Sequence, residues 1–347
     1  MRPESRRARR ATLAVATIAA GALVTVDARA FCRTMTCPLP PDFSPAPGAC
    51  VPDDFASYCA SLQPSAKTLP VWWRNACVSY DIQQDASSQV PYDTASQMFA
   101  AAFTKWTTTM CPEPAGDADA GGASAALAGT SRVSIDVRDF GPVACDEVQY
   151  NSDQGNQHVI IFHDDVWPHN DANNTLGLTT VTFDPDTGEI YDADMEINST
   201  VPLTLSDPIP AGGYDFQSII THECGHFLGM AHSGDDRATM FAHYTQGSTY
   251  MRVLTDDDVS GICSIYLPDG DRAVDPSTTA DGSGLVAEDS CDPTPRHGFS
   301  TQCATSASHP CSAAGSPGAG AGSSPTALLL FAGGVVGTRR MRRRPCR

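Results

Sequence analysis

The central part of this 347-residue sequence contains few basic residues. Of the 22 lysines and arginines, twelve lie in residues 1–30 and 311–347, which leaves ten against 38 of the 40 acidic residues. A body with this charge repels the phosphates of nucleic acids and anionic membrane surfaces. We therefore expect neither as a partner. The composition suits a soluble, exported protein, and one able to bind calcium.

The sequence also lacks an apolar run of the roughly 20 residues that a membrane-spanning helix needs. The apolar stretch 11–26 follows four arginines in residues 6–10 and precedes the small-residue cleavage site at 28–30. This pattern predicts a secretory signal peptide over residues 1–30 instead of a membrane anchor. Thirteen cysteines behind such a signal predict disulfides formed in an oxidising compartment, with their connectivity open.

Residues 311–347 contain a second processing signal. Cys311 opens a spacer rich in Gly, Ser, Ala and Pro, the apolar run 327–337 follows, and five arginines lie in residues 339–344. The basic end would stay on the cytoplasmic side of a membrane. The arrangement resembles the tripartite sorting tails of bacterial surface proteins, specifically the myxobacterial type. It implies contact with a membrane through this tail alone, and a plain disordered tail is the alternative.

Composition divides the remaining chain into three parts. Residues 31–66 are rich in Cys and Pro and predict an N-terminal extension held by disulfides. Residues 67–268 predict one domain of a size that buries a proper core. Residues 269–310 are rich in Asp, Ser, Thr, Gly and Pro, and this composition predicts a flexible linker or stalk.

Within the domain, apolar periodicity predicts five strands and three helices. One helix runs through 95–106 with Thr94 and Gln97 as a capping box, and a last helix begins at Thr255 with Asp258 at its N3 position. A further helix begins near Tyr214. The expected strands lie at 78–82, 133–137, 159–162, 176–183 and 189–198.

The run from His222 to His232 is the most specific feature of the sequence. On a helix, His222 and His226 lie at positions i and i+4, so both imidazoles point from one face and can share an ion. Gly229 lets the helix end in a left-handed residue, after which a turn can bring His232 to the same ion. Three neutral ligands leave a zinc ion one open position, where the pKa of a bound water falls to about 7.

Glu223 is the candidate catalytic residue beside these ligands. It lies about 100° from His222 around the helix, close enough to reach a water on the metal without replacing it. A structural zinc site is the alternative interpretation, but it needs a fourth protein ligand. Cys224 points about 200° away from His222 and is excluded from that role.

Three further features resemble the metzincin metallopeptidases and, among them, the matrixin family. Ser233 directly follows the third histidine, Met240 follows it by eight residues in Ala238-Thr239-Met240, and residues 254–262 are similar to the last matrixin helix. The resemblance implies an α+β, zincin-like fold with a mixed, twisted five-stranded sheet, three helices and a zinc cleft. It implies that 176–183 is an edge strand that pairs with a peptide substrate.

The same resemblance implies roles for the residues after the histidines. Met240 would support the zinc site from below, and the segment between Met240 and Met251 would form the wall of the pocket for the side chain after the scissile bond. We find no convincing cysteine-switch motif upstream, so the sequence does not predict a latent form.

Asp192, Asp194 and Glu196 alternate along one strand and share a face near the turn at 184–188. Carboxylate oxygens are the ligands calcium prefers, so these residues are a candidate calcium site, with a solvated acidic strand face as the alternative. A second zinc at the cluster His158, His163 and His169 is less favoured.

We also predict two disulfides, one joining Cys224 to Cys263 and the other Cys77 to Cys111. The combined expectation is a secreted or surface-attached, monomeric zinc endopeptidase that acts on protein or peptide substrates, with Glu223 as general base. The alternatives are a non-catalytic surface adhesion module that contains zinc, and an amidase of cell-wall peptides.

Overall fold

The computed structural model describes residues 31–36, 69–112, 130–272 and 291–303. The predicted signal peptide, most of the N-terminal extension and the predicted sorting tail lie outside these residues. The elements, in chain order, are β1 (Cys77–Gln83), α2 (Tyr92–Thr107), β2 (Met110–Pro112), β3 (Thr130–Arg132), β4 (Asp136–Val143), β5 (Val159–His163), β6 (Gly177–Phe183), β7 (Ile190–Asn198), β8 (Leu203–Thr204), β9 (Tyr214–Asp215), α3 (Phe216–Phe227), the 3₁₀ turn η1 (Tyr250–Arg252) and α4 (Asp256–Ile265).

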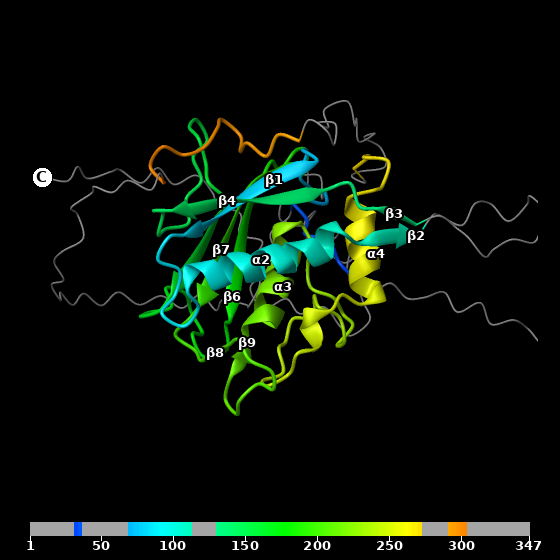
Figure 1. The fold of residues 1–347 in the computed structure, drawn as a ribbon. Coiled ribbons are helices and arrows are strands. Elements are labelled where there is room, and N and C mark those ends of the chain that lie inside the picture. The colour runs from blue at the N-terminus through cyan, green and yellow to red at the C-terminus, as the bar shows by residue number, and fades with distance from the viewer. Residues whose placement is uncertain (1–30, 37–68, 113–129, 273–290, 304–347) are drawn as a thin grey trace, which may run out of the picture.

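Five strands form one mixed sheet in the order β4-β1-β5-β7-β6. The neighbouring pairs are parallel except β6 and β7, which are antiparallel, so β6 is an edge strand. Helix α2 packs against β4 and β1, and α3 packs against β6 and β7, side by side with α2 (Figure 1). The prediction of a mixed five-stranded sheet with three helices is confirmed. Within the described residues, no helix combines the length and apolar character needed to cross a membrane.

The core lies between the sheet and the two helices α2 and α3. The apolar face of α2 is buried, and Phe99 of this face meets Phe162 of β5 and Phe216 of α3 edge to face. The predicted cap of α2 is wrong, because the helix begins at Tyr92 with Pro91 as its N-cap. The carbonyl of Pro91 accepts the N–H of Thr94, so Thr94 already lies inside the first turn.

Helix α4 begins as predicted. Thr255 is its N-cap, and Thr255 and Asp258 form a reciprocal capping box. The box satisfies backbone N–H groups that a helix leaves unpaired at its N-terminus. Asp258 is fully buried, whereas aspartate side chains in proteins are usually exposed to solvent.

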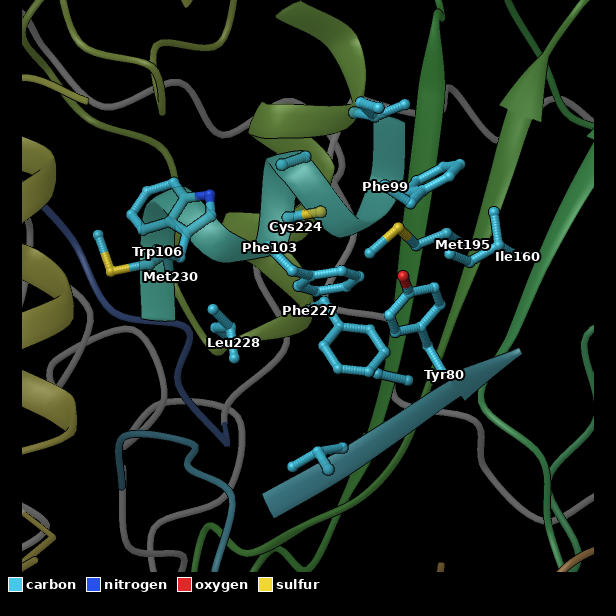
Figure 2. Packing of buried hydrophobic residues seen from close by; sticks show 14 of the residues in the cluster. Tyr80, Phe99, Phe103, Trp106, Ile160, Met195, Cys224, Phe227, Leu228 and Met230 are labelled. Atoms are coloured by element: carbon cyan, nitrogen blue, oxygen red, sulfur yellow. The ribbon is translucent and has the colours of Figure 1, made fainter. Parts of the chain in front are cut away.

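Three disulfides lie in the described residues, and they correct both predicted pairings. Cys77 bonds to Cys291, and Cys111 bonds to Cys263. Cys224 has no disulfide partner and is buried in the core between α2 and α3 (Figure 2). The prediction of a Cys224–Cys263 bond failed because β2, not α3, packs beside α4, so Cys111 of β2 is the cysteine that reaches Cys263.

The third disulfide joins Cys145 to Cys303. Together with Cys77–Cys291 it fixes both ends of residues 291–303 to the domain. Backbone bonds add to this attachment, since Ser300 donates to Asn156 and Ala144 donates to Cys303, each at 3.0 Å.

Candidate functional site

Three histidines converge at the end of α3. His222 and His226 lie one turn apart on the helix, and their Nε2 atoms are 3.1 Å from each other. His232 arrives from the turn after the helix. The ligand atoms of the three side chains lie within 4.8 Å of one another, which no other group of three His, Cys, Asp or Glu achieves in the part of the chain that the structure describes.

The second ring nitrogen of each helical histidine faces a backbone carbonyl. Nδ1 of His222 lies 2.6 Å from the oxygen of Thr239, and Nδ1 of His226 lies 2.9 Å from the oxygen of Met230. A carbonyl can only accept, so each Nδ1 carries the proton and each Nε2 presents a lone pair. Two lone pairs 3.1 Å apart repel each other unless a cation lies between them, and the donor set is one that zinc prefers.

Burial keeps these histidines in the neutral form that a metal requires. Burial lowers the pKa of His222 to about 4. For His226 and His232, burial and then the neighbouring imidazoles hold the pKa well below its usual value. The residues therefore fit a zinc ion.

The turn that brings in His232 depends on Gly229. Helix α3 ends at Phe227 with Leu228 as C-cap, and Gly229 adopts a φ of +90°. Only glycine takes this conformation without strain. The N–H of Met230 returns to the carbonyl of Gly225 at 3.0 Å, which closes the end of the helix.

A short N-terminal segment supports the same turn. Thr34 donates its N–H to the Gly229 carbonyl, and Ala231 donates to the Cys32 carbonyl, both at 2.9 Å. The Thr34 hydroxyl donates to the Met230 carbonyl at 3.0 Å, the oxygen that also faces His226. Sequence reasoning missed this contact, because 196 residues separate Thr34 from Met230.

Met240 lies buried beneath α3, against Gly225. A Cβ at Gly225 would collide with the Met240 sulfur and with the Trp106 ring, so this glycine permits the close approach. Asp258 fixes the turn around Met240: its Oδ1 accepts the Met240 N–H at 3.0 Å, and its Oδ2 accepts the Thr239 N–H at 2.9 Å. The sequence identified Asp258 as a helix cap, and gave no sign of this second role.

Glu223 lies between α3 and β6, with 3% of its surface exposed. Burial raises the pKa of this carboxyl to about 7, and a hydrogen bond from Thr179 opposes the rise. The Thr179 hydroxyl donates to Oε2 at 2.7 Å. A carboxylate with a pKa near neutrality can accept and return a proton under ordinary conditions.

A cavity of about 400 Å³ opens beside His222 and Glu223. Its walls come from the segment before β6 and the first residue of β6, from β9, from α3 and from the segment between α3 and α4. Its apolar and aromatic lining comes from Leu176, Tyr214, Ile219, Phe241, Tyr244 and Met251, and polar side chains of Asp171, Asn173, Asn174 and Gln246 also line it. One of its walls is the segment between Met240 and Met251, for which the matrixin resemblance implied this role.

The acidic face of β7 is buried, so it is not the solvated face considered above. Asp192, Asp194 and Glu196 are 2%, 1% and 5% exposed. His163 and His169 each contact one oxygen of Glu196, at 2.8 and 2.9 Å, whereas His158 lies apart from them, 3.6 Å from Asp192.

This arrangement does not fit either second metal site well. The two oxygens of Asp194 accept the backbone N–H groups of Val159 and Gln149, at 2.8 and 3.2 Å. Both Glu196 oxygens are also engaged, and of the three side chains only Asp192 has a carboxylate oxygen without a hydrogen-bond partner among the described residues. One such oxygen falls far short of the six to eight ligands of calcium. The calcium site stays a prediction that this geometry does not support, and the three histidines of the second zinc are not brought together.

The segment that carries the histidine cluster is similar to known metallopeptidases. Residues 145–267 match the Matrixin family model. The chain is 34% identical over 104 residues to human "Matrilysin", which is 30% of the chain and 36% of that protein. It is 30% identical over 122 residues to "Probable matrix metalloproteinase 095L" of Invertebrate iridescent virus 3, covering 34% of the chain and 31% of that protein.

The chain is also 32% identical over 135 residues to "Matrix metalloproteinase-16" of Homo sapiens, covering 37% of the chain and 21% of that protein. The chain thus spans about a third or less of the length of these curated relatives. The Matrixin match covers His222, Glu223, His226, His232 and Met240 together. These similarities support a metalloprotease domain in this part of the chain.

Proposed function

We propose that this protein is a zinc-dependent endopeptidase. The observation that carries the proposal is the convergence of three histidines, two buried and one half-buried, beside the buried carboxylate of Glu223. His222, His226 and His232 would hold the zinc. When bound there, zinc supplies a Lewis acid that polarises the scissile carbonyl and makes a water more acidic.

Glu223 performs the proton transfers. In its ionised form it accepts a proton from the attacking water, and it later donates that proton to the amine of the leaving fragment. Each transfer needs a carboxylate oxygen within about 3 Å of the oxygen or nitrogen that gives or takes the proton, so the fixed position of Glu223 between α3 and β6 matters as much as its pKa.

The edge strand β6 supports recognition of an extended peptide. Its outer side has no strand partner in the described sheet, so a substrate backbone can add there as a further strand. A peptide on β6 passes Glu223, because Gly177 and Thr179 of this strand lie against that side chain. The apolar cavity beside His222 is then placed to accept one substrate side chain.

We also propose that the protein is exported by the signal peptide at 1–30, acts outside the cell as a monomer, and is secreted or attached through residues 311–347. A non-catalytic zinc-containing adhesion module is not favoured, since it has no need of a buried carboxylate beside the histidines. An amidase of cell-wall peptides uses the same chemistry, and a substrate-profiling digest separates it from a general endopeptidase.

The decisive experiment compares Glu223→Ala with Glu147→Ala, which removes an exposed glutamate of the same domain. Both variants should retain one equivalent of zinc by elemental analysis. Only Glu223→Ala should lose turnover of casein and of a quenched peptide library. Chelation should abolish wild-type activity, and added zinc should restore it. Full activity in Glu223→Ala would refute the proposal.

A further inference from the structure

Strand β6 contacts the carboxylate of Glu223 through two of its residues. The Thr179 hydroxyl donates to Oε2 at 2.7 Å, and both groups are buried. In the described part of the chain no other side chain donates a hydrogen bond to this carboxylate. We propose that Thr179 is a positioning residue that holds Glu223 in the orientation needed for proton transfer, an inference that rests on the proposed function.

Gly177 completes the arrangement. It lies two residues before Thr179, so the two residues face the same side of the strand. A Cβ at Gly177 would lie 2.6 Å from Oε1 and 2.8 Å from Cδ of Glu223. The absence of a side chain there makes room for the carboxylate, and the Thr179 hydroxyl fixes its other oxygen.

The two carboxylate oxygens of Glu223 have different surroundings, and this difference suits a general base. A glutamate side chain has three rotatable bonds, so its carboxylate samples many orientations unless a hydrogen bond restricts it. Threonine is stiff at χ1 because it is branched at Cβ, so its hydroxyl is a well-defined anchor. With Oε2 held by Thr179, Oε1 remains the oxygen that exchanges a proton with the reacting groups.

The position of Thr179 has a further consequence. The strand that holds the base is also the edge strand proposed to pair with the substrate backbone. One rigid element would therefore set the location of the scissile bond and the location of the base. Small displacements between reacting groups reduce rates strongly, so this shared support has a direct kinetic value.

The test compares Thr179→Val, which removes the hydroxyl, with Thr179→Ser, which keeps it. Thr179→Val should lower kcat by about tenfold to a hundredfold, as the loss of an orienting partner typically does. KM and zinc affinity should change little, because the pocket and the ligands are untouched. Thr179→Ser should restore most of the activity, and Thr179→Ala gives a second variant without hydroxyl if Thr179→Val folds poorly.

Thr109→Val is the matched control. Thr109 is buried to a similar extent and donates its hydroxyl to the Lys105 carbonyl at 2.9 Å, away from the histidines. This variant loses a buried hydrogen bond of the same kind, so it reports the effect of reduced stability alone. Its kcat should equal that of the wild type. A loss of kcat in Thr109→Val equal to that in Thr179→Val would overturn the proposal.

A measurement without turnover tests the contact itself. With zinc saturating, the decrease in unfolding temperature caused by Thr179→Val should be larger in the wild type than in Glu223→Ala, because only the former has the partner. Equal decreases in the two backgrounds would overturn the proposal, as would wild-type kcat in Thr179→Val. An inactive wild-type enzyme would instead refute the proposed function, while this coupling would still be measurable.

Discussion

One carboxylate oxygen of Asp258 accepts a hydrogen bond from the backbone N–H of Met240 at 3.0 Å. The second oxygen of Asp258 accepts a hydrogen bond from the N–H of Thr239 at 2.9 Å. The carbonyl oxygen of Thr239 in turn lies 2.6 Å from Nδ1 of His222. The cap of α4 is thus connected to His222, a proposed zinc ligand on α3, through a single peptide unit. Outer partners of this kind orient metal-bound histidines and are costly to lose.

The first prediction follows from this chain of contacts. Asp258→Asn places an amide NH₂ against one of the N–H donors that the carboxylate now accepts. We expect the turn around Met240 to shift and zinc affinity to fall by about tenfold to a hundredfold. Competition with a chromogenic chelator measures the affinity. Asp256→Asn, an exposed first-turn residue of the same helix, should keep wild-type affinity; equal affinity in both variants contradicts the prediction.

A second prediction concerns the close approach at Gly225. In Gly225→Ala the new methyl group meets Met240 and Trp106, so the helix and the turn must separate. Overpacking of this kind costs about 1–3 kcal/mol of unfolding free energy, measured by urea denaturation of the zinc-loaded protein. Adding Met240→Ala should give a double variant less destabilised than the sum of the two changes. Simple additivity would show that Met240 is not the obstacle.

The third prediction is a pH dependence of stability. Asp81 is buried, and burial raises its pKa to about 7, while Gln157 donates to it at 2.6 Å and opposes the rise. Folding therefore favours the protonated form. This contribution to stability is complete below the unfolded pKa of about 4 and is lost as the pH rises through 7.

Asp81→Asn removes the loss of stability at higher pH, because an amide stays neutral and its oxygen can still accept a hydrogen bond from Gln157. The unfolding temperature of the variant should rise relative to wild type progressively between about pH 4 and about pH 7 and stay level above that range. Thermal scans with zinc saturating measure the gain. Asp85→Asn, an exposed neighbour, should show no such trend. A gain that does not grow with pH would contradict the assignment.

The fourth prediction concerns the N-terminal segment. Thr34→Val removes the hydroxyl that shares the Met230 carbonyl with His226. The carbonyl loses one of its two donors, and the turn leading to His232 becomes less fixed. We expect a several-fold faster loss of zinc to excess chelator, with Thr109→Val at the wild-type rate. An unchanged rate in Thr34→Val would mean that the segment adds no support to the site.

Spacing along the chain predicted the parts of the site that are local. His222, Glu223 and His226 lie on one helix, and Gly229 ends it, so their relation follows from helical geometry. The alternation along β7 likewise put Asp192, Asp194 and Glu196 on one face of the strand, opposite the core residues Ala193, Met195 and Ile197. These features need no knowledge of which elements pack together.

Contacts between distant elements were not predictable in this way. Thr179 reaches Glu223 across 44 residues, and Asp258 reaches Met240 across 18, and both depend on the packing of separate elements. The disulfide predictions failed for the same reason: Cys224 and Cys263 both lie on inward faces of helices, but Cys111 of β2 is the thiol that lies beside α4. The direction in which a side chain points can be read from the sequence, whereas its neighbour on another element cannot.

The covalent bond between Cys145 and Cys303 has a mechanical consequence. Cys145 lies two residues after the end of β4, which is the sheet edge opposite β6 (Figure 1). A pull on the chain beyond Cys303 therefore enters the domain at β4 and is shared across β1, β5 and β7 before it reaches the strand that holds Glu223. We expect tension or tethering at that end to leave the geometry of the three histidines undisturbed.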